Sequence, residues 1–131
     1  MGVRFPSVST TTNLGVLPAS AAETAIITTP PLNISLDFAV VFLAWFLAIT
    51  TGATTTALVF RIRRGSGLTG ATIGAAVWTH TIGAAASAVL SGKYSDTPGA
   101  VAAQQYTLTV SQTGATGAGT LNDNMFLAFS L

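Results

Sequence analysis

The chain has 131 residues, of which half are hydrophobic and only 7% are charged, and its formal net charge is +1. It has no cysteine, which excludes disulfides and thiolate metal sites, and it has no basic arm, which argues against a protein that packages nucleic acid. A monomer with so few charges would have little electrostatic repulsion to prevent association, so we expect an obligate oligomer or a lattice protein.

The first segment, 1–22, is rich in Ser, Thr, Pro and Ala and shows no periodicity. This composition predicts an extended or flexible N-terminal arm. The rest of the chain, 23–131, consists of β-rich runs separated by Gly, Pro, Asn and Asp, and we assign it to one β-sandwich domain. Residues 97–105 alone are compatible with a helical turn. The expected strands lie within 23–29, 36–50, 55–65, 67–83, 85–95, 104–114 and 123–131.

The stretch "SLDFAVVFLAWFLAITTG", residues 35–52, is the most apolar part of the chain. It could be a membrane span, a buried helix or a strand covered on both faces. A transmembrane helix needs about 20 apolar residues, and the Thr, Pro and Gly residues that flank this run shorten it too far. A strand has a period of two, and here both of its faces are apolar. One face would lie in the core and the other against a neighbouring subunit, for which Leu43, Trp45 and Leu47 are the interface candidates.

Three arginines gather in "FRIRRG": Arg61, Arg63 and Arg64. In so uncharged a chain they require anionic partners, and Arg–Asp pairs between strands or between subunits would supply them. The alternative is a surface that binds an anionic partner, such as nucleic acid or a glycan.

Residues for catalysis are scarce. His80 is the only histidine, and its position two residues from Trp78 predicts a structural or interface role on a strand face. No motif singles out a nucleophile, and a metal site would need ligands from one histidine and four scattered carboxylates. We therefore expect no catalytic residue, no metal and no cofactor, and we do not expect an enzyme.

Three segments carry a resemblance to a known group of proteins: "FLAITTGATTTALVFRIRRG", "YSDTPGAVAAQQYTLTV" and "GTLNDNMFLAFSL". With these segments the chain resembles the single jelly-roll proteins of virions, which include capsid decoration or cement proteins, and the TNF-like and C1q-like trimers. The resemblance implies an all-β, single jelly-roll-like antiparallel sandwich that forms homotrimers. It also implies an aromatic last strand at the subunit interface, which makes Phe126 and Phe129 interface candidates.

The favoured hypothesis is a non-enzymatic structural protein of a virion, in a bacteriophage, that decorates or cements the capsid. Its partners would be itself, as a homotrimer or lattice, and the major capsid protein or another virion protein, without nucleic acid or membrane. One alternative is the receptor-binding or glycan-binding trimeric head of a tail fibre, which predicts exposed aromatics such as Tyr94 and Tyr106. The others are a self-assembling shell or tube subunit and a membrane-inserted protein.

Overall fold

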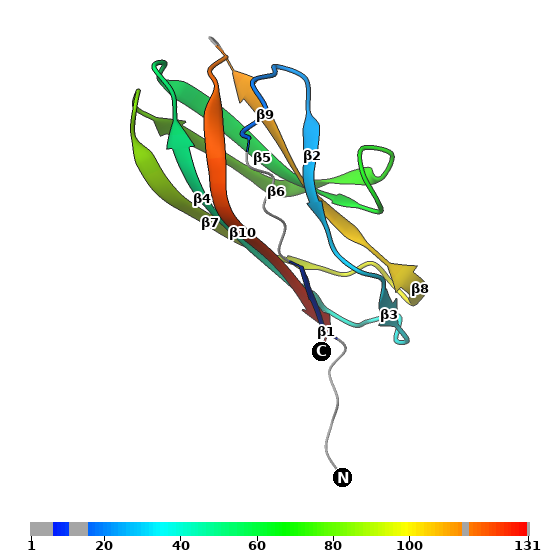
Figure 1. Ribbon diagram of the computed structural model, residues 1–131. Helices are drawn as coiled ribbons and strands as arrows, with labels where there is room; N and C mark the ends of the chain where they lie inside the picture. The colour runs from blue at the N-terminus through cyan, green and yellow to red at the C-terminus, as the bar shows by residue number, and fades with distance from the viewer. Residues whose placement is uncertain (1–6, 11–15, 114–115, 131) are drawn as a thin grey trace.

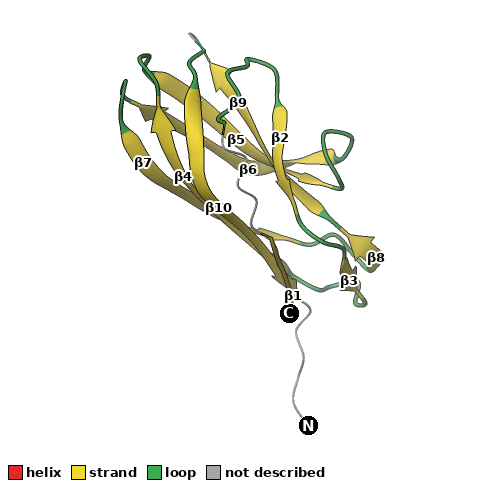
Figure 2. Ribbon diagram, in the orientation of Figure 1, coloured by secondary structure: helices red, strands yellow, loops and turns green. Residues whose placement is uncertain are grey.

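The computed structural model describes residues 7–10, 16–113 and 116–130, and in these residues the secondary structure is ten β-strands without any helix. Eight strands form two four-stranded sheets that face each other, and two short strands form a separate pair (Figures 1 and 2). The described residues accordingly offer no helix that could span a membrane. The strands are β1 (Ser7–Thr10), β2 (Thr24–Thr28), β3 (Leu32–Ile34), β4 (Val41–Thr51), β5 (Thr56–Arg64), β6 (Ala71–Ile82), β7 (Ser87–Asp96), β8 (Val101–Gln104), β9 (Tyr106–Thr113) and β10 (Gly119–Ser130).

The strand order is β1-β10-β4-β7 in one sheet and β2-β9-β5-β6 in the other, and neighbouring strands are antiparallel. Apart from the β5–β6 hairpin, each successive main strand lies in the opposite sheet. This winding is that of an eight-stranded jelly roll. The predicted all-β, jelly-roll-like sandwich is therefore confirmed.

The small pair β3–β8 lies in the connections that precede β4 and β9. The sequence allowed a helical turn in this part of the chain, but Val101–Gln104 forms a strand. Pairing with β3 gives its backbone the hydrogen-bond partners that a short helix would otherwise have supplied.

Strand β4 lies between β10 and β7, and its side chains alternate between the interior and the outside of the sandwich. The inward set is fully buried and meets the opposite sheet, where Trp45 packs on Phe60 with ring centroids 4.8 Å apart. The outward set is only partly buried by the chain itself. β4 therefore has one face in the core and one apolar face that the described residues cover only in part.

The structure corrects which residues form that uncovered face. Leu43, Trp45 and Leu47, predicted as interface candidates, point into the core and are at most 2% exposed. Phe126 of β10 is also fully buried, whereas Phe129 lies on the outside. A period of two defines two faces without saying which is inward, and in the structure the set that contains the indole lies between the sheets. Substituting Asp for Trp45 or Leu43 would thus act on folding first.

Part of the predicted N-terminal arm contacts the sandwich. Ser7–Thr10 pairs with the end of β10, and the buried Leu17 donates its backbone N–H to the carbonyl of Gly119 at 2.9 Å. From Val16 onward the arm leads into β2, and 1–6 and 11–15 lie outside the described residues. The division of the chain at residue 22 stays a prediction.

Gly92 of β7 faces the interior, beside the rings of Trp45 and Trp78, whose centroids are 5.4 Å apart in an edge-to-face arrangement. A Cβ atom at position 92 would overlap Nε1 of Trp45 and approach the ring of Trp78 to 2.7 Å. The two indoles therefore fill the space that a side chain would need. Only glycine at position 92 lets β7 pack against both indole rings.

Gly92→Ala should lower the free energy of unfolding by about 1–3 kcal/mol, because the added methyl group overpacks a filled core. Gly74→Ala in β6 is the matched control, since its Cβ would meet nothing within 4 Å. Urea unfolding of both variants measures the difference. Equal stability of the two variants would contradict the packing described for Trp45 and Trp78.

Candidate assembly surface

The outside of the β1-β10-β4-β7 sheet carries a continuous set of apolar side chains. Its members are assigned by the alternation along β4 and by the cross-strand register, in which Phe42, Ala44 and Phe46 lie opposite Phe129, Leu127 and Met125. Side chains opposite each other in a register point to the same side of a sheet. We name this surface the outer apolar face, and it consists of Phe42, Ala44, Phe46, Ala48, Val89, Met125, Leu127 and Phe129.

Several of these side chains are open to solvent in the single chain. Val89 is 67% exposed and Met125 is 42% exposed. Phe42 and Phe129 stack with centroids 5.3 Å apart and an interplanar angle of 22°. An open depression of about 620 Å³ lies beside this stack, and Lys93, Tyr94 and Ser95 also line it. Exposed apolar surface of this extent is typical of an interaction site.

The two charges on this face have opposite signs. Lys93 of β7 lies opposite Ala44, and Asp123 of β10 lies opposite Ala48, so both point outward, and both are exposed. Among the described residues, no other charged side chain shares this face. The rest of the β7 edge is polar, with Ser87, Ser91 and Ser95 pointing outward.

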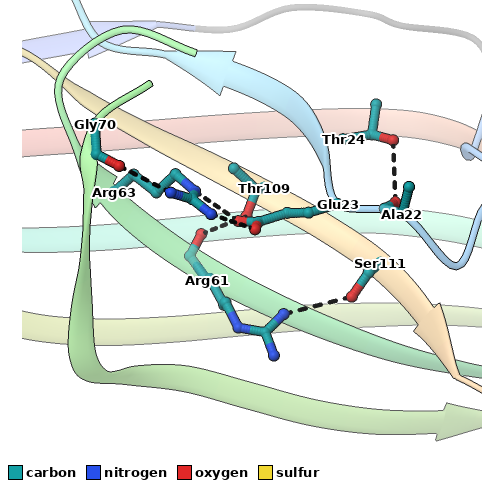
Figure 3. Close-up of polar contacts among 8 residues, drawn as sticks. All are labelled: Ala22, Glu23, Thr24, Arg61, Arg63, Gly70, Thr109 and Ser111. Atoms are coloured by element: carbon teal, nitrogen blue, oxygen red, sulfur yellow. Dashed lines mark hydrogen bonds and ion pairs between the residues drawn. The ribbon is translucent and has the colours of Figure 1, made fainter. Parts of the chain in front are cut away.

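The outside of the β2-β9-β5-β6 sheet is different, because the chain covers it with its own polar groups. Glu23, just before β2, accepts hydrogen bonds from Nε and Nη2 of Arg63 at 2.9 and 2.5 Å and from the hydroxyl of Thr109. Arg63 also donates from Nη1 to the carbonyl of Gly70 at 2.8 Å (Figure 3). Thr109 is therefore buried although it points outward. Thr107 also points outward and is buried, and its hydroxyl forms hydrogen bonds with Thr28, Gly65 and Gly67.

Arg64 makes the second ion pair of the arginine cluster, and it links the two sheets. Its Nε and Nη2 donate to Asp96 at 2.8 and 2.5 Å, and the hydroxyl of Tyr106 donates to the same carboxylate at 2.9 Å. Asp96 ends β7 in one sheet, while Arg64 and Tyr106 belong to the other. Burial and the charge of Asp96 raise the pKa of Tyr106, and the hydrogen bond to Asp96 raises the pKa of Arg64.

The predicted Arg–Asp pairing is thus confirmed for Arg64, whereas Arg63 pairs with Glu23, which sequence reasoning did not identify. Arg61 donates from Nη1 to the hydroxyl of Ser111 at 3.4 Å (Figure 3). The three arginines therefore make contacts within one chain. Their assignment as interface candidates stays a prediction.

Of the remaining candidate residues, His80 and Tyr106 lie apart from the outer apolar face, whereas Tyr94 lines the depression beside the Phe42–Phe129 stack. His80 lies on β6 with Trp78, and its ring centroid is 6.4 Å from that of Trp45 and 6.1 Å from that of Phe60. Tyr106 is fully buried and Tyr94 partly buried. The described residues contain no group of three or more His, Asp or Glu side chains that could hold a metal ion.

No protein-family model matches the chain, and no curated protein matches it. Among solved structures, it is similar to a chain in the structure of infectious bursal disease virus, Gx strain, with a TM-score of 0.53 and 12% identity over 95% of this chain. The Gt strain gives a TM-score of 0.50 and 11% identity over 96%. The chain spans 33% and 31% of those viral chains. A structure of disulfide-linked pili from Bacillus endospore appendages has 21% identity over 98% of this chain and 92% of that one, with a TM-score of 0.45.

At such identities the viral likeness concerns the fold. It agrees with the resemblance to virion jelly-roll proteins drawn from the sequence. The sandwich of this chain is therefore one that also occurs in the structure of a virus.

The Glu23–Arg63 pair predicts a loss of stability at acid pH. The pKa of Glu23 is lowered from 4.5 to about 2, chiefly by the hydrogen bond from Arg63. Burial raises this pKa, and the hydrogen bond from Thr109 lowers it further. Because the folded pKa lies below the unfolded one, this contribution is complete above pH 4.5 and is lost as the pH falls towards 2. The Glu23→Gln variant should have a lower free energy of unfolding than the native chain at neutral pH. Its free energy of unfolding should also fall less than that of the native chain between pH 4.5 and pH 2. Urea unfolding at a series of pH values measures both effects, and parallel pH profiles would count against the pair.

Proposed function

We propose that this chain is a non-enzymatic structural protein of a virion that self-associates and decorates or cements the capsid. The observation that carries the proposal is the outer apolar face. A sheet in water normally presents polar side chains on its outer side, whereas this one presents three phenylalanines and a methionine on two neighbouring strands.

The size of the face fits a subunit contact. Strands of about ten residues that rise 3.3 Å per residue and lie 4.8 Å apart give about 500 Å² over three strands. Two such faces in contact would bury about 1,000 Å², which is the lower bound for a specific interface. The 131 residues contain no cysteine, so no disulfide can join these residues between subunits. Burial of the face would stabilise the folded subunit by mass action.

The virion part of the proposal is supported by the jelly-roll winding and by the viral likeness in fold. A decoration or cement protein fits better than the shell of a small virus because the basic residues are few. Of the five lysines and arginines, Arg63 and Arg64 are neutralised by Glu23 and Asp96. Little positive charge is left to bind a packaged genome. The homotrimer and the bacteriophage source are expectations from the sequence resemblance.

The alternatives predict different surfaces or different particles. A glycan-binding fibre head predicted exposed Tyr94 and Tyr106, but Tyr106 is fully buried and bonded to Asp96. A self-assembling shell or tube subunit would use the same apolar face. Electron microscopy of the purified chain separates decoration from self-assembly, because discrete oligomers support a decoration protein and closed shells or tubes support a self-assembling subunit.

Phe46→Asp should abolish self-association without unfolding the chain. Phe46 lies at the centre of the outer apolar face and is only partly buried within one chain, so a carboxylate there meets water in the monomer and apolar surface in the assembly. Sedimentation velocity should show the native chain as an oligomer and the variant as a monomer.

The matched control is Val77→Asp, which places the same charge at an exposed apolar position of β6 in the other sheet. It should leave the oligomer intact. A native chain that is monomeric at high concentration, or a Phe46→Asp variant that associates as the native chain does, would overturn the proposal.

A further inference from the structure

The two charges of the outer apolar face are placed symmetrically about Phe46. Lys93 lies opposite Ala44, two residues before Phe46, and Asp123 lies opposite Ala48, two residues after it. The two side chains flank β4 on opposite sides, because β7 and β10 are its two neighbours (Figure 1). They are therefore equally far from Phe46 along the strand and across the sheet.

Such an arrangement is self-complementary. The two-fold axis that lies in the plane of the face, passes at Phe46 and is perpendicular to the line from Lys93 to Asp123 carries each of these two positions onto the other. In an isologous contact, if one residue of a subunit meets a second residue of its partner, the second also meets the first. One such contact would therefore form two Lys–Asp pairs and leave neither charge unpaired.

We propose that a second copy of this chain packs on the outer apolar face through a two-fold contact centred on Phe46, with Lys93 of each copy facing Asp123 of the other. The inference rests on the self-association proposed above and names its symmetry and its register. The apolar side chains supply the buried area, and the two charge pairs fix which orientation is populated.

Charge complementarity favours a second copy over an unrelated partner. A foreign surface would have to present an acidic and a basic group at matching places, whereas this face carries both itself. On the two-fold axis the Phe46 rings of the two copies meet, and the small side chains Ala44 and Ala48, which flank Phe46 along β4, leave room for the two rings to pack side by side.

The two-fold contact restricts the number of chains in the assembly. It gives a dimer, and because the predicted homotrimer would bury Phe129 of the same face, the two-fold contact and that trimer contact exclude each other. The mass in solution should therefore correspond to an even number of chains. A free homotrimer would contradict the inference.

The test reverses the charge of Lys93 in one variant and of Asp123 in another, and then mixes the two variants. Lys93→Glu and Asp123→Lys each turn both attractive pairs into repulsive ones, so at low ionic strength each variant alone should associate about tenfold more weakly or worse. In an equal mixture of the two variants, the carboxylate introduced at position 93 of one copy meets the ammonium group introduced at position 123 of the other. The unchanged Asp123 of the first copy likewise meets the unchanged Lys93 of the second. The mixture should associate about as tightly as the native chain, as measured by sedimentation velocity.

Asp37→Lys is the control, since it makes the same change of charge at an exposed position in the β3–β4 connection, and it should leave association unchanged. Thermal unfolding checks that each variant folds. Failure of the mixture to recover association would overturn the two-fold contact. If in that case the native chain is an oligomer and the Phe46→Asp variant is a monomer, the proposed self-association stands and only its symmetry is wrong.

Discussion

A central strand with apolar side chains on both sides can be stable in water only if both of its faces are covered. β4 is such a strand, because Leu43 and Trp45 lie on one face and Phe42 and Phe46 on the other. The opposite sheet covers the first face. Within the described residues the chain has no layer to place over the second, so the second face sets a requirement for another molecule.

The two outer surfaces of the sandwich differ in how far the described residues cover them. On the β2-β9-β5-β6 sheet, Glu23 and Arg63 form a hydrogen-bonded layer with Thr109, which is buried within one chain although it points outward. On the β1-β10-β4-β7 sheet the corresponding positions are aromatic or small apolar residues. The Arg64–Asp96–Tyr106 cluster joins the sheets at one end and fixes their relative position. The outer side of the β2-β9-β5-β6 sheet thus makes its polar contacts within one chain, whereas the apolar outer side of the β1-β10-β4-β7 sheet is available for assembly.

The sequence predicted much of this fold, because alternation and turn residues are local signals. The runs 36–50 and 85–95 correspond to β4 and β7, and the alternation predicted near the C-terminus holds from Asn124 to Ser130, beyond the register shift between Leu121 and Asp123. Sequence reasoning assigned the wrong side of β4 to the core, since period two leaves the inward direction undefined. The Glu23–Arg63 pair and the contact of Gly92 with Trp45 depend on cross-strand register, which no local pattern encodes. The symmetric placement of Lys93 and Asp123 about Phe46 also depends on cross-strand register.

The most direct measurement of the central claim is hydroxyl-radical footprinting of the native assembly against the same chain diluted to monomers. Val89 and Met125 are the most exposed side chains of the outer apolar face, and Val77 of β6 is exposed on the other sheet. The account predicts that assembly lowers the oxidation rates of Val89 and Met125 several-fold and leaves that of Val77 unchanged. Equal oxidation of Val89 and Met125 in both states would contradict it, because the face would then be open to water in the assembled protein.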